Sequence, residues 1–357
     1  MRNIRQALHD NPGLSGNEVF AHDTVIAFLQ RLQPQRIFDR VGGYGVVAYW
    51  GTDETLPTVA LRADMDALPI GHRCGHDGHT TILLRVAQLI HEQPITDRGI
   101  LLVFQPEEET GYGSQKILDS GVLEPYDIRC FLGCHNIPGF PLHQLILADT
   151  TFAAASTGVC YHLHGRATHA STPELGINPG RAVAEIIEQI LNLGHPGNDI
   201  LSFRQTTLIS IRLGEKTFGT SAGDADICFT LRAFSNTTMH NLVGQADAIV
   251  EHTAKKSQLQ FSREFVEPFH ATVNHTAVVE QLRQISQVDG VEAVTVGQPF
   301  RWSEDFANYL LRYPGAFFGI GAGTDHRELH HPCYEFPDEL IEPTARLFYR
   351  FSSQIKI

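Results

Sequence analysis

The chain has 357 residues, of which 42% are hydrophobic and 19% charged, as in ordinary globular proteins. Its formal net charge of -13 and the lack of a basic stripe argue against nucleic acid and anionic membranes as partners. No apolar stretch approaches the roughly 20 residues of a membrane span, and the N-terminal segment lacks the apolar core of a signal peptide. We therefore expect a cytoplasmic protein that is long enough for two cores.

Strand-like and helix-like patterns alternate along the first part of the chain. Ser15–Glu18 has the pattern of a capping box that opens a helix running towards Leu32. Strands are then expected at 45–50, 58–63, 100–105 and 128–134. A helix is expected after residue 79, through residue 90. The alternation predicts an α/β fold with a mixed, mostly parallel sheet flanked by helices.

The pattern changes near residue 157. Elements are then expected at 158–164 (strand), 178–193 (helix), 202–213 and 226–234 (strands), 237–256 (helix) and 258–265 (strand). The order βαββαβ is that of the ferredoxin-like α+β arrangement. Helix-strand alternation resumes after residue 268 and ends with a helix at 340–355. We therefore expect one discontinuous domain, 1–156 and 268–357, with residues 157–267 inserted as a second domain.

The segment Cys74–His79 (CGHDGH) contains one thiol, two imidazoles and one carboxylate within six residues. Thiolate, imidazole and carboxylate are the protein groups that bind borderline divalent ions such as zinc. The alternative interpretation is a polar loop without a metal.

Two further segments place ligand-type residues after apolar runs that are expected as buried strands. Gln105–Glu109 (QPEEE) follows Ile100–Phe104, and Cys134–Asn136 ends the run that starts at Cys130. Three carboxylates at a strand end repel one another unless a cation or a shared proton compensates. Because sites form at the carboxyl ends of strands in open α/β sheets, both segments are expected at the same edge.

The cysteines show no spacing typical of a disulfide framework; they lie at positions 74, 130, 134, 160, 228 and 333. Cys74 has to stay reduced to bind a metal. Cys130 and Cys134 are expected as core residues rather than as a redox pair.

Short motifs along nearly the whole chain occur in the order found in one enzyme family. They are residues 5–14 (RQALHDNPGL), 61–69 (LRADMDALP), 74–79, 104–109, 134–136, 165–173 (GRATHASTP), 303–306 (SEDF) and 329–332 (LHHP). On these residues the chain resembles the M20 amidohydrolases, in particular the aminoacylase-like branch (subfamily D) with hippurate hydrolases and IAA-amino acid (auxin-conjugate) hydrolases. The resemblance implies a zinc-exopeptidase-like catalytic domain and a ferredoxin-like lid domain.

The resemblance also implies a site for two divalent metal ions, most simply zinc or manganese, with nickel or cobalt as alternatives. The implied ligands are Cys74, shared by the two ions, and His76, Glu109, His135 and His330. His331 is the alternative to His330. Glu108 is implied as the general base, and a slip of one residue in the glutamate triplet would exchange these roles.

Other residues are implied around the metals. His169 is the expected catalytic donor to the tetrahedral charge and a substrate contact, reaching the site from the lid or from a neighbouring subunit. Arg232 is expected to bind a substrate carboxylate, with a surface salt bridge as the alternative. Asp64, Asp77 and His79 are expected to orient the metal ligands through hydrogen bonds.

The implied activity is that of a metallo-amidohydrolase, which cleaves the amide bond of an N-acyl amino acid with metal-activated water and a glutamate base. The alternatives are a dipeptidase or aminopeptidase on the same site, and a non-catalytic homologue that binds metal or a small amide. Only Gly71–Arg73 separates Ile70 from Cys74, where relatives carry a longer segment that helps to wall the substrate pocket. A homodimer formed through the lid is the expected assembly.

Overall fold

The computed structural model describes residues 1–197, 199–288 and 290–356, and the chain divides into two compact units. Unit 1 comprises Met1–Phe152, Thr272–Gly297 and Glu304–Ile357. Unit 2 comprises Ala153–Ala271 and Gln298–Ser303. The segment Gln298–Ser303, which the sequence pattern placed in the first domain, thus belongs to unit 2.

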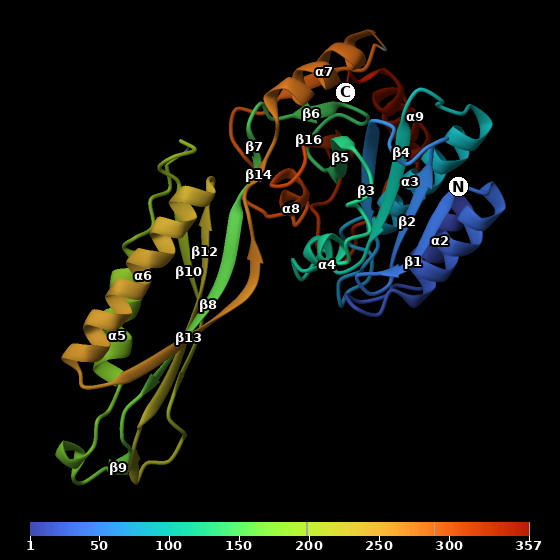
Figure 1. Cartoon of the computed structure of the whole chain (residues 1–357). Helices are drawn as coiled ribbons and strands as arrows, with labels where there is room; N and C mark the ends of the chain where they lie inside the picture. Colours follow the sequence, from blue (N-terminus) through green and yellow to red (C-terminus); the bar gives the residue numbers. More distant parts are fainter. Residues whose placement is uncertain (198, 289, 357) are drawn as a thin grey trace. The chain divides into compact units, whose positions relative to one another are not determined.

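Within the described residues of unit 1, eight strands form one sheet in the order β1-β2-β4-β3-β5-β16-β6-β15 (Figure 1). Their bounds are Arg36–Val41 (β1), Gly45–Trp50 (β2), Thr58–Asp64 (β3), Gly99–Gln105 (β4), Ile128–Ile137 (β5), Leu145–Leu147 (β6), Ala293–Thr295 (β15) and Gly315–Gly321 (β16). The central strands β4, β3, β5 and β16 are parallel, while β1, β2 and β6 introduce antiparallel pairs. The predicted mixed, mostly parallel α/β fold is therefore confirmed.

Helices pack on both faces of this sheet. The main apolar core joins one face to α1 (Arg2–Asp10), α2 (Val19–Leu32), α3 (His76–Glu92), α7 (Thr276–Val288) and α9 (Ile341–Gln354). On the other face Phe131 of β5 packs against Tyr309 of α8 (Ala307–Leu310), and α4 (Gly113–Asp119) contacts α8. Strands buried on both faces need apolar side chains at nearly every position, which explains runs such as Gly99–Gln105.

The capping box expected at Ser15–Glu18 is wrong. Helix α2 begins at Val19, and no side chain caps its N-terminus. Ser15 Oγ instead donates a hydrogen bond to Asp66 Oδ2 at 2.6 Å, and Glu18 Oε1 accepts one from the Gly16 amide at 2.8 Å. The side chains of Ser15 and Glu18 therefore form hydrogen bonds to Asp66 and Gly16 and do not cap the helix.

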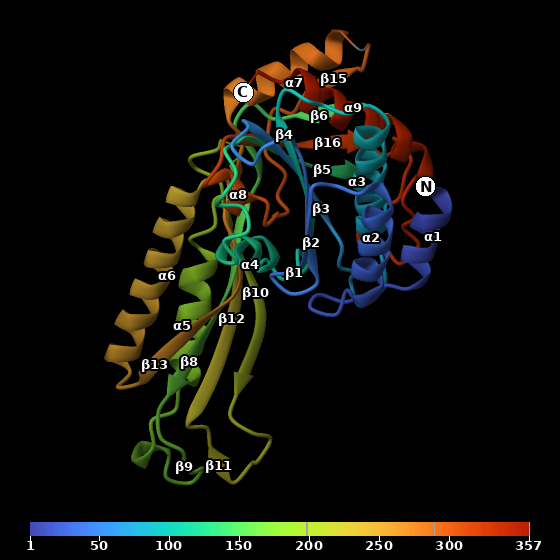
Figure 2. The same ribbon diagram turned by 45° about the vertical axis from the view of Figure 1, so that its right-hand side comes forward.

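The described part of unit 2 holds a four-stranded antiparallel sheet in the order β10-β12-β8-β13. Its elements are β8 (Ala155–His164), α5 (Gly180–Leu191), β10 (Arg204–Leu213), β12 (Asp224–Ala233), α6 (Asn236–Lys256) and β13 (Gln260–Phe269). Both helices pack on one face of the sheet, over a core that includes Tyr161 and Phe229 (Figure 2). The strand order and the βαββαβ sequence are those of the expected ferredoxin-like arrangement.

The remaining elements are short. They are the pairs β9 (Thr168–His169) with β11 (Thr220–Ser221) and β7 (Thr151–Ala153) with β14 (Thr272–Val273), and the 3-10 turns Pro173–Leu175 and Asp338–Leu340. Across the described ranges, no helix has both the length and the apolar content that crossing a membrane requires.

Cys160 and Cys228 form a disulfide between β8 and β12. This bond was not anticipated from the cysteine spacing. The two cysteines are 68 residues apart in the chain but directly opposite each other in the strand register, which their spacing does not reveal. In the described structure the other cysteines are free thiols, and Cys130 and Cys134 are buried in the core as expected.

Candidate metal centre

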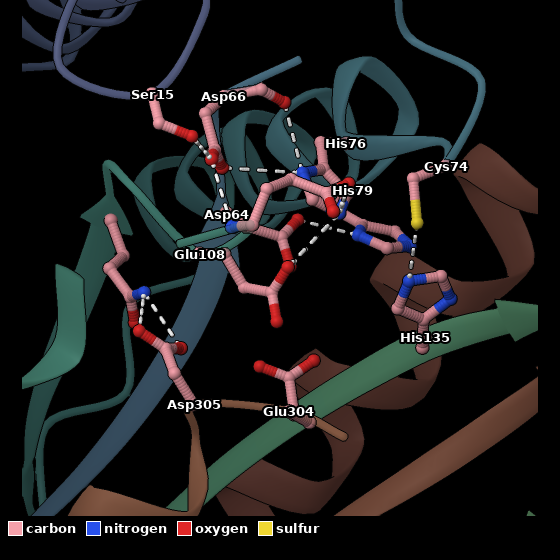
Figure 3. Close-up of polar contacts among 12 residues, drawn as sticks. Ser15, Asp64, Asp66, Cys74, His76, His79, Glu108, His135, Glu304 and Asp305 are labelled. Carbon is pink, nitrogen blue, oxygen red and sulfur yellow. Dashed lines mark hydrogen bonds and ion pairs between the residues drawn. The ribbon is translucent and has the colours of Figure 1, made fainter. Parts of the chain in front are cut away.

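The candidate site of unit 1 forms where the parallel strands end (Figure 3). Strand β3 ends at Asp64, the glutamate triplet follows β4, and His135 lies near the end of β5. Gly75 precedes α3 with a φ of +98°, and a Cβ there would lie 2.5 Å from Asn136 Oδ1. Glycine alone fits this close, left-handed position, which lets the chain turn from Cys74 into the helix.

The structure brings the five predicted metal ligands together in two overlapping groups. Within each group the possible ligand atoms lie within 4.8 Å of one another; the groups are Cys74, His76 and His135, and Cys74, Glu109 and His330. Cys74 Sγ lies 3.4 Å from His135 Nε2, and His76 Nε2 lies 3.8 Å from Glu109 Oε1. Cys74 belongs to both groups, as a ligand shared by two ions would.

The donor atoms fit divalent cations. His76 Nε2 and Glu109 Oε1 are buried and make no hydrogen bond within the described structure. Burial raises the pKa of the Cys74 thiol well above its usual value and that of Glu109 to about 7. Unpaired donors gathered in this way are unfavourable by themselves, and a cation among them would hold the thiol and the carboxyl ionised.

Backbone carbonyls orient two of the imidazoles. His76 Nδ1 lies 2.9 Å from the carbonyl oxygen of Asp66, and His135 Nδ1 lies 2.8 Å from that of Asn136. Each Nδ1–H can therefore donate to a carbonyl, which leaves the Nε2 lone pair directed toward the other ligands.

The three residues expected to orient the ligands have different surroundings. Asp64 Oδ1 lies 2.6 Å from His79 Nδ1, and Asp64 Oδ2 lies 3.8 Å from His76 Nε2. Asp77 instead lies 2.8 Å from Nδ1 of His9, a residue of α1. Asp64 and His79 thus border the ligand groups, while Asp77 joins α3 to α1.

His330 and His331 are distinguished by their contacts. His330 has a φ of +64°, and its amide donates to the Arg73 carbonyl oxygen at 2.8 Å. This contact brings the loop to Cys74, in whose group His330 lies. His331 Nδ1 accepts a hydrogen bond from the Cys333 amide, and among the described residues it belongs to no ligand group. The geometry therefore favours His330.

A buried charged cluster beside Glu108 was missed by sequence reasoning. The guanidinium of Arg62 contacts the carboxylates of Asp64, Glu304 and Asp305 at 2.6, 3.0 and 2.8 Å. Figure 3 shows the carboxylates of Glu108 and Glu304 directed toward each other. Burial raises the pKa of Glu304 to about 8 and that of Glu108 well above its usual range. The signal in the sequence was the acidic pair 304–305 inside the SEDF motif.

His169 and Arg232 belong to unit 2. His169, on β9, is exposed, and its Nδ1 lies 2.7 Å from Ser171 Oγ. Arg232, on β12, donates to the Arg301 carbonyl oxygen at 2.8 Å and to Ser303 Oγ at 3.1 Å. Both of these acceptors are neutral oxygen atoms, and Ser303 Oγ belongs to the SEDF motif.

An α/β sheet with thiolate, imidazole and carboxylate donors gathered at its strand ends defines a class of metal-binding enzyme. The chain belongs to peptidase family M20/M25/M40, whose model matches residues 60–354. The chain is 31% identical over 372 residues to the IAA-amino acid hydrolase ILR1-like 4 of Arabidopsis thaliana, covering 97% of this chain and 83% of that protein.

Two further similarities extend the comparison. The N-acetyl-L-cysteine deacetylase of Bacillus subtilis is 26% identical over 371 residues, covering 99% of this chain and 87% of that protein. The fold matches that of YXEP of Bacillus subtilis, described as a dinuclear metal binding peptidase from M20 family, with a TM-score of 0.83 at 23% identity over 99% of this chain and 96% of that one. The prediction of a metallo-amidohydrolase of the M20 family is therefore confirmed.

Proposed function

We propose that the protein hydrolyses the amide bond of N-acyl amino acids with the help of two divalent metal ions. The observation that carries the proposal is a buried carboxylate, Glu108, beside two ligand groups that share Cys74. The relatives named as hydrolases of amino acid conjugates and of N-acetyl-L-cysteine support this substrate class.

The metal ions, zinc or manganese in the first place, would be held by the five residues of the two ligand groups: Cys74, His76, Glu109, His135 and His330. When bound, such a pair polarises an amide carbonyl and lowers the pKa of a water molecule to roughly 7.

Glu108 moves the proton in this proposal. Its carboxylate accepts a proton from the attacking water and returns that proton to the leaving nitrogen of the amide. A raised pKa suits the task, because a carboxyl group that binds its proton more tightly is a stronger base toward the water.

Two residues of unit 2 are proposed to handle the rest of the substrate. The imidazole of His169 would donate a hydrogen bond to the oxygen that gains charge, and the guanidinium of Arg232 would bind the carboxylate of the amino acid. Arg232 is suited to this task because the contacts of its guanidinium to Arg301 and Ser303 are to neutral oxygen atoms, which leave its positive charge available for a carboxylate.

A homodimer formed through unit 2 is part of the proposal. Strand β10 lies at an edge of the described four-stranded sheet, and its side chains Ile209, Ile211 and Leu213 are 60%, 48% and 44% exposed. Long, apolar edge strands tend to pair with a second chain. Sedimentation of the parent and of an Ile211→Lys variant tests this part: a monomeric parent would contradict it.

The test of the activity uses the purified chain loaded with zinc or manganese and two matched substrate sets, N-acyl amino acids and dipeptides with a free amino terminus. Turnover of the first set, lost in Glu108→Gln, supports the proposal. Turnover of the dipeptides alone would favour the peptidase alternative, and a metal-loaded protein that hydrolyses neither would favour a non-catalytic homologue.

A further inference from the structure

The turn after β4 carries both the proposed base and a metal ligand, and its backbone is unusual. Glu107 has a φ of +55°, in the left-handed region that residues with a Cβ rarely adopt. The next two residues are Glu108 and Glu109. A left-handed conformation at such a position persists only where the surrounding structure holds it.

Two buried carboxylates accept hydrogen bonds from the backbone of this turn. The amide of Glu107 donates to Glu18 Oε1 at 3.0 Å, and the amide of Glu109 donates to Asp66 Oδ2 at 3.0 Å. Glu18 Oε1 also accepts from the amide of Gly16 at 2.8 Å. The loop before α2 is thus connected to the turn that orients the glutamates.

Glu18 lies in surroundings that are unfavourable for a carboxyl group. Its side chain is fully buried, and its Oε2 makes no hydrogen bond within the described structure. A buried carboxyl group with an unpaired oxygen destabilises the folded state. Its other oxygen, Oε1, accepts from the amides of Gly16 and of the left-handed residue Glu107.

We propose that Glu18 is a positioning residue, whose Oε1 holds the Glu107 peptide in its left-handed conformation and thereby directs Glu108 and Glu109 toward His76. The roles of Glu108 as base and Glu109 as ligand rest on the proposed function. The hydrogen bond that fixes the turn does not depend on those roles.

The first comparison is between Glu18→Ala, which removes the acceptor, and Glu18→Gln, which keeps one amide oxygen for the two backbone N–H groups. Zinc affinity is measured by competition with a chromophoric chelator, without any substrate. Glu18→Ala is expected to bind zinc about 10- to 100-fold more weakly, as when the supporting partners of other metal sites are removed. Glu18→Gln is expected to stay close to the parent.

Two further variants separate positioning from general destabilisation. Val25→Ala opens a cavity in the core under α2, the helix that follows Glu18, so it lowers the melting temperature while zinc affinity stays at the parent value. The double variant Glu18→Ala with Glu107→Gly is expected to recover part of the lost affinity, because glycine adopts the left-handed conformation without help.

Parent-like zinc affinity in Glu18→Ala would overturn the proposal, as would a loss of equal size in Glu18→Gln or in Val25→Ala. If the zinc-loaded parent hydrolyses no N-acyl amino acid, the proposed function fails, but the affinities of the four variants still decide the role of Glu18. If the parent is active, Glu18→Ala is expected to lower kcat with little change in KM, since the displaced groups act on the reaction rather than on substrate binding.

Discussion

The guanidinium of Arg62 lies 3.0 Å from Oε1 of Glu304, and each of these side chains is only 1% exposed. The same guanidinium also contacts Asp64 and Asp305. One cation therefore faces three buried carboxylates. The excess acidic groups lie next to the ligand groups, and a cation bound there would favour their ionised forms.

Arg62→Leu is expected to lower the free energy of unfolding by about 3–5 kcal/mol, because it leaves buried carboxylates without a counter-charge. Urea denaturation measures the change. Arg36→Leu is the matched control, because Arg36 forms an exposed pair with Glu54 at 2.9 Å and such pairs contribute about 0–1 kcal/mol. Equal losses in the two variants would contradict the expectation.

Glu108→Gln is expected to lower kcat by about 10²- to 10⁴-fold, the usual contribution of a general acid-base residue. The metal content should not change, because the substitution leaves the two ligand groups that share Cys74 intact; Glu108 also forms a group with His76 and Glu109, so a loss of metal would make it a ligand. Initial rates and elemental analysis of the same preparation check both statements. Glu124→Gln, which alters an exposed carboxylate paired with Arg312, serves as the control. A comparable rate loss in the control would contradict the role of Glu108 as the general base.

Zinc at about 100 times its dissociation constant is expected to stabilise the folded protein by about 2.7 kcal/mol relative to the metal-free protein. His330→Ala should reduce this gain, because His330 lies with Cys74 and Glu109. His331→Ala should leave it unchanged. Thermal melts with and without zinc, after treatment with a chelator, provide the measurement, and the opposite order of the two variants would move the ligand assignment to His331.

Loss of the Cys160–Cys228 disulfide, in a variant with serine at both positions, is expected to destabilise unit 2 by about 2–4 kcal/mol. The bond closes a long loop, since the cysteines are 68 residues apart. A reductant should lower the melting temperature of the parent but not that of the double variant. Cys333→Ser, at an exposed free thiol, should respond to reductant like the parent.

Acid unfolding should depend on the pair that joins α3 to α9. Arg85 Nε donates to Glu342 Oε2 at 2.8 Å, and this hydrogen bond lowers the pKa of Glu342 below its usual 4.5. A carboxyl group with a depressed folded-state pKa stabilises the fold above its unfolded pKa, and the contribution is lost as pH falls through the folded value. Glu342→Gln should therefore flatten the loss of stability below about pH 4.5; an unchanged slope of unfolding free energy against pH would contradict this.

The larger elements of the fold could be predicted because their sequence patterns are long and regular. The buried strands β3 and β4 have near-continuous apolar sequences, and α6 has a clear helical pattern. Strand β1 has no such pattern, since most of its residues are exposed or half-buried at the sheet edge. The side chains of Ser15 and Glu18 do not cap α2, because they form hydrogen bonds with groups that are distant in the sequence. These groups are the carboxylate of Asp66 and the amide of Glu107.

The ligand groups could be anticipated from local motifs, since Cys74 and His76 are two residues apart. The cluster around Arg62 could not, because its contact to Asp305 spans 243 residues. No local pattern says which acid faces which base across such a distance. The cross-strand pairing of Cys160 and Cys228 was hidden for the same reason.

The chain thus contains cysteines with opposite chemical requirements. The Cys160–Cys228 disulfide links two strands of the sheet in unit 2, whereas the buried Cys74 has to stay reduced if it is to bind an ion. Thiol reagents added to protect Cys74 during purification would also reduce the disulfide and compete for the metal. Anaerobic handling without such reagents is therefore the way to keep both features in a single sample.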